Sequence, residues 1–232
     1  MQSVLLDEHG HRTRRRDGVA RARRVAREDF DGWKITRGQM NFDAVILAGG
    51  RSSRMNHDKA FLEIDGRTLL ARQIELARQA GADKIFISGR AGKDYSAFNC
   101  PVLEDKFQDA GPLAGIERVL DAASMPLVLV LAVDLPNLTA DLVRIIFSSG
   151  GENAGAIPRI NGRIEPLAAF YPKAAHPLVL NLLREKSNAV KNFAAGCVAS
   201  GLATFVDLPA DNANLFVNWN SSADLQSTAA KR

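Results

Sequence analysis

Residues 127–133 read Leu-Val-Leu-Val-Leu-Ala-Val, and Asp134 follows directly. An apolar run of this length, made mostly of leucine and valine, is typical of a strand that is covered on both faces. Such strands occur in parallel sheets, because the connection between parallel strands is usually a helix that packs on the sheet. The run therefore predicts the central strand of an α/β protein.

Shorter apolar runs on both sides of this strand alternate with amphipathic stretches. Strands are expected at 44–48, 85–88, 102–104, 154–158, 167–171 and 204–206, and helices at 68–80, 112–123, 139–148 and 172–184. Thr68 is a suitable N-cap for the first of these helices and Gly81 a suitable stop. The order predicts a three-layer α/β/α architecture: a doubly wound, mostly parallel sheet with crossover helices on both faces.

The composition excludes several classes of protein. A chain of 232 residues with 46% hydrophobic and 24% charged residues can bury a sizeable core, so it is neither disordered nor fibrous. No stretch approaches the roughly 20 apolar residues of a membrane helix. Cys100 and Cys197 stand alone without a CxxC motif, which favours neither a zinc site nor a disulfide framework and fits a reducing cytoplasm.

The basic charge of the chain belongs to its first 39 residues. Residues 1–39 carry ten Lys and Arg against six Asp and Glu, so their surplus of four equals the net charge of +4 of the whole chain. Few apolar residues and no sustained periodicity favour a poorly ordered extension without a fold of its own. Nucleic-acid binding by this arm is the alternative. We expect residues 40–232 to form the folded domain.

A glycine pair follows the first predicted strand. The stretch 49–59 reads Gly-Gly-Arg-Ser-Ser-Arg-Met-Asn-His-Asp-Lys. Glycines let backbone N–H groups approach a phosphate closely, and Arg51, Arg54 and Lys59 add positive charge. The spacing matches neither GxGxxG nor the P-loop, so a turn with solvated charges is the competing interpretation. Its position favours an anion-binding loop, since ligands of doubly wound sheets bind at the carboxyl ends of the strands.

Polar residues also follow other predicted elements. Asp134 ends the most apolar strand, where a carboxylate needs a partner, and it is our candidate Mg²⁺ ligand; a helix N-cap is the alternative. Gly111 and Pro112 open a helix whose N-terminus can hold a phosphate, or they form only a glycine turn. Asn218 and Asn220 share one face of an extended stretch and suit phosphate or metal-bound water, or they form an Asx turn.

Four motifs in a fixed order carry a family resemblance. They are Leu47-Ala48-Gly49-Gly50-Arg51-Ser52-Ser53-Arg54-Met55 with Asp58-Lys59, then Glu104-Asp105 with Gly111-Pro112-Leu113-Ala114-Gly115, then Val133-Asp134-Leu135-Pro136, and finally Asn218-Trp219-Asn220. Over about residues 41–225 the chain resembles the molybdenum cofactor guanylyltransferase family of nucleotidyltransferases, and residues 165–171 resemble its acceptor-side strand.

This resemblance implies a Rossmann-like nucleotidyltransferase domain over residues 40–232 and a specific reaction. GMP would pass from GTP to the terminal phosphate of molybdopterin, giving the guanine dinucleotide cofactor and pyrophosphate, with Mg²⁺ as cofactor. Lys59, Arg54 and Asp134 would be catalytic, and Asp134 would also hold the metal. The implied GTP-binding residues are Leu47, Ala48, Gly49, Gly50, Lys59, Ser88, Asp105 and Asp134, and the implied acceptor or phosphate residues are Gly111, Asn218 and Asn220.

Two other functions fit the same residues. A related transferase could use CTP or UTP with a sugar or polyol phosphate, because nothing in residues 152–208 fixes the acceptor. The second is a non-catalytic nucleotide-binding partner in molybdoenzyme assembly. The expected partners are GTP and molybdopterin, together with proteins of cofactor biosynthesis and molybdoenzyme maturation, and neither nucleic acid nor a membrane.

Overall fold

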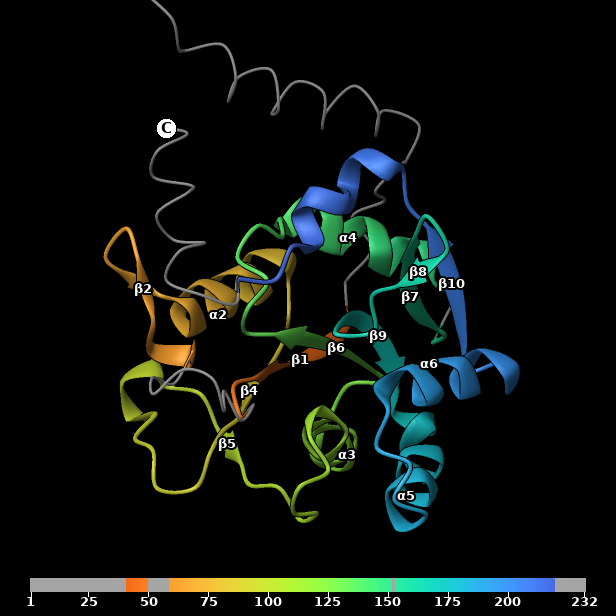
Figure 1. Ribbon diagram of the computed structural model, residues 1–232, viewed down its shortest axis with the longest axis horizontal. Coiled ribbons are helices and arrows are strands. Elements are labelled where there is room, and N and C mark those ends of the chain that lie inside the picture. Colours follow the sequence, from red (N-terminus) through yellow and green to blue (C-terminus); the bar gives the residue numbers. More distant parts are fainter. Residues whose placement is uncertain (1–40, 50–58, 152, 220–232) are drawn as a thin grey trace, which may run out of the picture. The chain divides into compact units, whose positions relative to one another are not determined.

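The computed structural model describes residues 41–49, 59–151 and 153–219 (Figure 1). The strands are β1 (Phe42–Leu47), β2 (Glu63–Ile64), β3 (Arg67–Thr68), β4 (Ile85–Ser88), β5 (Val102–Leu103), β6 (Leu127–Ala132), β7 (Gly155–Ile160), β8 (Arg163–Ile164), β9 (Ala168–Pro172) and β10 (Ala203–Asp207). Within the described ranges, eight of them form one sheet in the order β10-β7-β9-β6-β1-β4-β5, with β8 paired to β7. β2 and β3 form a separate antiparallel pair.

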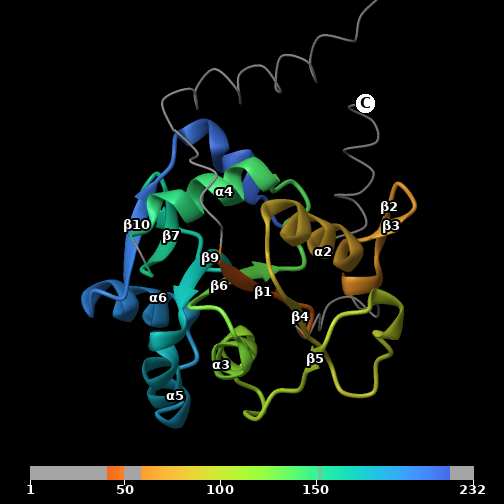
Figure 2. The same ribbon diagram turned by 180° about the vertical axis from the view of Figure 1, so that it is seen from behind.

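Helices cover both faces of this sheet, which confirms the predicted α/β class. The helices are α2 (Leu69–Ala80), α3 (Pro112–Ala122), α4 (Ala140–Ser149), α5 (His176–Arg184) and α6 (Val190–Ala199). α2 and α4 lie on one side of the sheet, and α3 and α5 lie on the other (Figures 1 and 2). No helix in the described ranges has the length and apolar character needed to cross a bilayer.

Two helices differ from the sequence-based expectation. The helix expected at 172–184 begins only at His176, because Pro172 ends β9 and residues Lys173–Ala175 form a 3-10 turn. Helix α6 was not expected, and it occupies the stretch before β10. Both differences lie in the second half of the chain, away from the predicted glycine loop.

The strands β1, β4, β5 and β6 pair in parallel, whereas the rest of the sheet contains an antiparallel strand, β9. β1 pairs in parallel with β4 and with β6, and β4 pairs in parallel with β5. β9 runs antiparallel to its neighbours β6 and β7, because the chain reaches β9 through the short β7–β8 hairpin and a turn instead of a helical crossover. The expectation of a mostly parallel sheet is confirmed.

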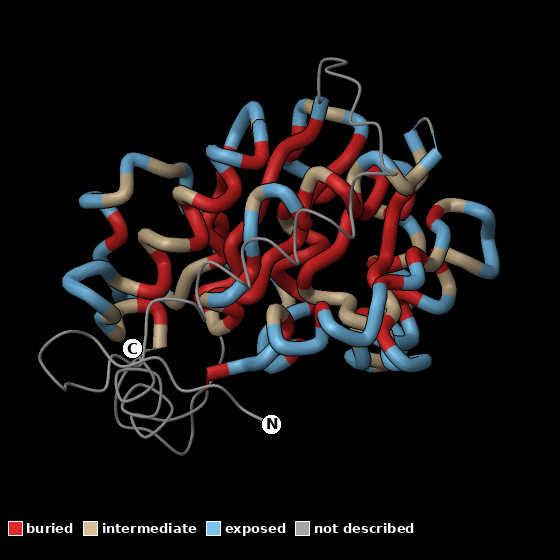
Figure 3. The backbone as a smooth tube through the Cα atoms, turned by 90° about the horizontal axis from the view of Figure 1, so that it is seen from above, coloured by how far each residue is buried: buried red, intermediate tan, exposed pale blue. Residues whose placement is uncertain are grey.

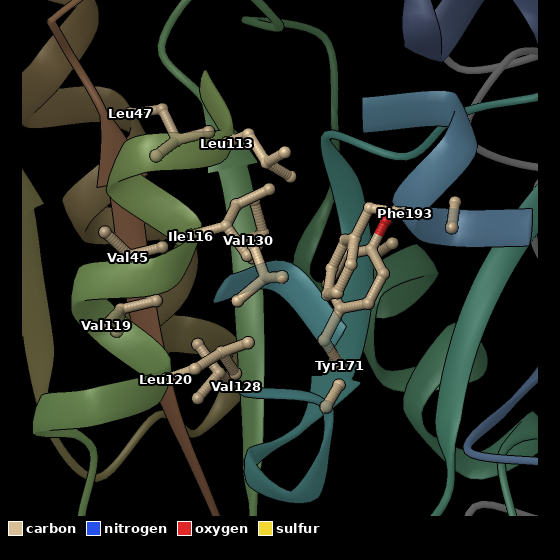
Figure 4. Close-up of a cluster of buried hydrophobic side chains, with 14 of the residues drawn as sticks. Val45, Leu47, Leu113, Ile116, Val119, Leu120, Val128, Val130, Tyr171 and Phe193 are labelled. Atoms are coloured by element: carbon tan, nitrogen blue, oxygen red, sulfur yellow. The ribbon is translucent and has the colours of Figure 1, made fainter. Parts of the chain in front are cut away.

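The core lies between the sheet and its helices. β1 and β6 are buried along their whole lengths, and Figure 3 shows buried backbone concentrated in the central strands. Figure 4 shows Ile116 and Leu120 of α3 directed at Val128 and Val130 of β6. Full burial of such a side chain contributes about 1.5–3 kcal/mol to the stability of the fold. The packing of this face therefore fixes the position of α3 on the sheet, including the position of its first residues.

A buried carboxylate ties together the edge of the sheet where β1 begins. Asp43 has no solvent exposure and accepts hydrogen bonds from the backbone N–H groups of Lys84, Ser124 and Met125 and from the hydroxyl of Ser124. These donors precede β4 and β6, so one side chain sets the starts of three neighbouring strands. Buried charge is tolerated here because it is fully hydrogen-bonded.

Candidate active site

The opposite edge of the sheet collects the residues that follow the parallel strands. Leu47 at the end of β1 lies beside Ser88 of β4 and Ala132 of β6, and Ser88 lies beside Leu103 of β5. The chain therefore leaves β1, β4, β5 and β6 at one edge, which is where ligands bind in open α/β sheets. Gly49, Asp105 and Asp134 each lie two residues or fewer beyond a strand at this edge.

An ion pair joins two of the predicted catalytic residues. Lys59, in the 3-10 turn η1 (Lys59–Phe61), lies 75 residues from Asp134 in sequence, and its Nζ is 3.1 Å from Asp134 Oδ2. The side chains are 21% and 18% exposed, so the pair sits at the surface of the core with solvent access.

The segment that carries Asn218 is attached directly to Asp134. The backbone N–H of Trp219 donates to the backbone carbonyl of Asp134 at 3.0 Å. This bond places the exposed Asn218 beside the end of β6. Asn220, Gly50 and Arg54 lie outside the described residues.

Backbone groups of the first motif are partly used within the sheet. The N–H of Ala48 donates to the carbonyl of Ser88 at 2.9 Å, and the carbonyl of Leu47 accepts from Val133 at 3.3 Å. These bonds hold the end of β1 between its neighbours. The nucleotide contacts that the resemblance implies for Leu47 and Ala48 would therefore use backbone groups other than the Leu47 carbonyl and the Ala48 N–H. Gly49 follows them in the chain.

Ser88 and Asp105 form a second pair of predicted residues. The Ser88 hydroxyl lies close enough to the Asp105 carboxylate to lower the pKa of that carboxyl. Asp105 keeps solvent contact, but partial burial of its carboxyl raises its pKa, and the Ser88 hydroxyl and the Arg118 charge oppose that rise. Ser88 itself is 3% exposed, whereas Asp105 is exposed to solvent.

Helix α3 approaches this pair closely because of a glycine. A Cβ on Gly115 would lie 2.4 Å from Ser88 Oγ and 2.8 Å from Leu47 Cδ2. Gly111 precedes the helix with a φ of 63°, a conformation that favours glycine, and Pro112 occupies the first turn. The N-terminus of α3, with N–H groups suited to an anion, thus lies against the strand ends.

Aromatic packing fixes the turn that carries Lys59. Phe61 in η1 stacks on Tyr95 with ring centroids 5.6 Å apart, and it also contacts Phe98. The Tyr95 hydroxyl accepts from the backbone N–H of Arg90 at 3.0 Å, which holds the loop after β4. The Lys59 turn is therefore packed on the residues that follow β4.

Sequence reasoning missed one buried polar residue near Asp134. Gln73 of α2 is 1% exposed, and its Nε2 donates to the Leu135 carbonyl at 2.7 Å. Gln73 lies on the helix face that also carries the buried Leu70 and Ile74. A glutamine within an apolar helical stripe is the signal that could have identified it.

Residues 165–167, which precede β9, also lie at this edge. The backbone N–H of Ala132 donates to the carbonyl of Leu167, just before β9. Glu165 lies in the same turn, with Oε1 3.1 Å from Arg163 Nε. Burial raises the pKa of Glu165, and the charges of Arg163 and Lys191 oppose that rise.

The donor set at Asp134 fits a magnesium ion that is shared with a substrate. No group of three or more His, Cys, Asp and Glu side chains gathers in the described part of the chain, so no cage made only of protein ligands exists there. Mg²⁺ is commonly bound through one or two carboxylates and completes its coordination with phosphate oxygens and water. One accessible carboxylate beside an ammonium group matches that requirement.

Comparisons with known proteins identify the family. The model of the MobA-like NTP transferase domain matches residues 44–197. A protein of Opitutus terrae named probable molybdenum cofactor guanylyltransferase is 36% identical over 183 residues, which are 78% of this chain and 91% of that protein.

Two solved structures share the fold at lower identity. Molybdopterin-guanine dinucleotide biosynthesis protein A from Archaeoglobus fulgidus has a TM-score of 0.63 at 18% identity, covering 82% of this chain and all of that one (100%). The 2-C-methyl-D-erythritol 4-phosphate cytidylyltransferase from Thermus thermophilus has a TM-score of 0.60 at 22% identity, covering 81% of this chain and 98% of that one. With the family match over most of its length, this chain belongs to the MobA-like family of nucleotidyltransferases.

Proposed function

We propose that this enzyme transfers GMP from GTP to the terminal phosphate of molybdopterin, giving the guanine dinucleotide cofactor and pyrophosphate. The observation that carries the proposal is the Lys59–Asp134 pair at the carboxyl edge of the parallel strands. Its substrates follow the name of the Opitutus terrae relative, which aligns over most of both chains.

The reaction needs charge and alignment more than proton transfer. A terminal phosphate oxygen of the acceptor forms a bond to the α-phosphorus of GTP. The bond from that phosphorus to the oxygen bridging the α- and β-phosphates breaks, and pyrophosphate leaves with the electron pair. A phosphate monoester has a second pKa near 6, so the attacking oxygen is already mostly ionised at neutral pH. No general base is required.

The chain supplies positive charge and N–H donors for the triphosphate. Lys59 and Arg54 carry the cationic side chains, and Gly111 lies at the start of α3, whose N–H groups favour anions. Preorganised charges of this kind are usually the largest contribution to the rate. Ser88 and Asp105 would bind the nucleoside, with the backbone of residues 47–50.

Asp134 would hold a divalent cation, for which we propose Mg²⁺, and Asn218 and Asn220 would bind phosphate or the water around it. When bound, such a cation neutralises charge on the phosphates. Asp134 and Lys59 then act as a pair that fixes where the triphosphate lies. The cytoplasm is the proposed location, because Cys100 and Cys197 are both free thiols.

A pyrophosphate-release assay over a matrix of nucleotides and acceptors tests this function. The purified protein is given GTP, CTP, UTP or ATP with Mg²⁺, and either molybdopterin or a sugar or polyol phosphate. We expect release above background with GTP and molybdopterin, and weaker release with CTP, because a site that hydrogen-bonds guanine leaves polar groups unpaired around cytosine.

Other outcomes of the matrix identify the competing functions. Release with CTP or UTP and a polyol phosphate would reassign the enzyme to a related transferase, whose fold is also shared. Tight GTP binding without release from any acceptor would identify a nucleotide carrier in molybdoenzyme assembly. The Asp134→Asn variant measures background in every well.

A further inference from the structure

A side chain of helix α2 hydrogen-bonds to the backbone of the residue that follows Asp134. Beyond β6, Leu135 begins a turn in which its carbonyl accepts from the Leu138 N–H at only 3.4 Å. The same carbonyl accepts from Gln73 Nε2 at 2.7 Å, across 62 residues of sequence. The side chain of Gln73 therefore makes the shorter of the two bonds that fix the residue after Asp134.

The orientation of the Gln73 amide follows from its surroundings. Placing Oε1 against the Leu135 carbonyl would oppose two acceptors, so the nitrogen must face that carbonyl. Oε1 is buried and has no hydrogen-bond partner among the described residues. An unmet buried acceptor costs free energy, so burial of this amide is poorly explained by stability alone.

Helix α2 also contacts the segment that carries Lys59. The N–H of Leu69, the first residue of α2, donates to the carbonyl of Leu62 at 2.8 Å, one residue beyond η1. Four residues later, Gln73 holds the turn of Asp134. Helix α2 is thus hydrogen-bonded both to the segment after Lys59 and to the segment after Asp134. The Nζ atom of Lys59 lies 3.1 Å from Oδ2 of Asp134.

We infer that Gln73 is a positioning residue that fixes Asp134 relative to Lys59 through the Leu135 carbonyl. The inference rests on the proposed function for its catalytic meaning. Displacement of a reacting or charge-bearing group by about 1 Å can lower a rate about 100-fold, so a 2.7 Å bond next to Asp134 is in a position to control turnover.

The test replaces Gln73 with methionine, which keeps the length of the side chain and removes the donor. Gln73→Leu is the second variant in case methionine perturbs folding. We expect kcat for GMP transfer to fall at least about tenfold, with KM for GTP changed less than about threefold, because the lost contact acts on the transition state. Calorimetric titration with Mg²⁺ at saturating GTP, without acceptor, should show weaker binding of the ion by about threefold or more.

Two controls separate positioning from general effects. Gln79→Met changes an exposed glutamine of the same helix and should leave both readings unchanged. Val179→Ala opens a cavity at a fully buried residue of α5, on the other face of the sheet, and should lower Tm without changing kcat. Equal losses of kcat in Val179→Ala and Gln73→Met would overturn the inference, as would wild-type kcat and Mg²⁺ affinity in Gln73→Met.

The two readings also distinguish the inference from the proposed function. If wild-type protein binds Mg²⁺ with GTP, Gln73→Met weakens that binding, and no acceptor yields pyrophosphate, the role of Gln73 stands and the assigned reaction fails. If neither protein binds Mg²⁺ with GTP, both fail.

Discussion

Lys59 and Asp134 each neutralise the charge of the other. A carboxylate at the end of a fully buried strand is costly without a partner, and an ammonium group 3.1 Å away supplies one. Because both side chains keep some exposure, the pair contributes modestly to stability. In the proposed function, its value lies in holding two opposite charges ready for a triphosphate and a divalent cation.

Replacing either charged group should lower turnover strongly. We expect Lys59→Ala and Asp134→Ala each to reduce kcat at least about 100-fold, the scale for loss of one strong electrostatic contact in a transition state. Pyrophosphate release with GTP and molybdopterin measures it. Lys106→Ala removes another ion-paired lysine, that of the Lys106–Asp121 pair, and should leave kcat unchanged. Near-normal turnover of a folded Lys59 or Asp134 variant would contradict the assignment.

The raised pKa of Glu165 predicts a dependence of stability on pH. A carboxyl whose pKa is higher in the folded state favours folding fully below its unfolded pKa of about 4.3, and this contribution is lost as pH rises through the folded pKa. Glu165→Gln should therefore raise Tm at pH 7 relative to wild type, and the gain should shrink as pH approaches 4. Thermal unfolding over that pH range measures it.

Asp207 provides the control of opposite sign. A hydrogen bond from Arg159 lowers the pKa of Asp207, so its charged form favours the folded state above its unfolded pKa. Asp207→Asn should give no gain in Tm at pH 7. A loss of Tm in Glu165→Gln at pH 7 would show that its pairing with Arg163 outweighs its burial.

Helix α3 links the hydrophobic core to the edge of the sheet at which β1, β4, β5 and β6 end. Its apolar face packs on β1 and β6, and its first turn lies beside Ser88 because Gly115 has no side chain. The position of the anion-favouring N-terminus is therefore set by packing along the rest of the helix.

Adding one methyl group to α3 should disturb this edge. Gly115→Ala places a Cβ within 3 Å of Ser88 and Leu47, so we expect a loss of about 1–3 kcal/mol in the free energy of unfolding and weaker GTP binding. Denaturant unfolding and calorimetry measure the two effects. Gly196→Ala in α6 is the matched control, because its new Cβ meets only the flexible end of Leu178 at 3.2 Å.

Local patterns predicted the elements whose periodicity is strong and missed those whose geometry depends on partners. The apolar run at 127–133 became β6, and Thr68 and Gly81 cap α2 as expected. The direction of β9 could not be read locally, because β9 is buried along its whole length and has the continuous apolar pattern that is usual for parallel strands, yet it runs antiparallel to β6. α6 carries alanines and a glycine, which weaken its amphipathic signal.

The proximity of Lys59 and Asp134 was predictable, because a general rule about strand ends applies to the whole sheet. Parallel strands present their carboxyl ends together, and this rule united Lys59 with Asp134 across 75 residues. The role proposed for Asn218 depends on the family motif, because an Asx turn has the same local pattern. Gln73 was missed because its partner is a backbone carbonyl, which no sequence pattern reveals.

The folded domain should function without the basic leading segment. We expect a protein lacking residues 1–39 to keep the Tm and kcat of the full chain, because the described core begins at β1 and contains both members of the Lys59–Asp134 pair. Calorimetry and the pyrophosphate assay compare the two proteins. A large loss of either quantity would assign these residues a role in folding or catalysis.

Paired charges project little electric field into solution. The fields of Lys59 and Asp134, only 3.1 Å apart, largely cancel over the Debye length of about 8 Å at physiological ionic strength. This pair therefore gives little long-range steering of a polyanion, and it adds little ionic-strength dependence to the association rate of the magnesium nucleotide. We therefore expect this pair to distinguish the correct nucleotide from others through the dissociation rate of the bound ligand, and not through its association rate.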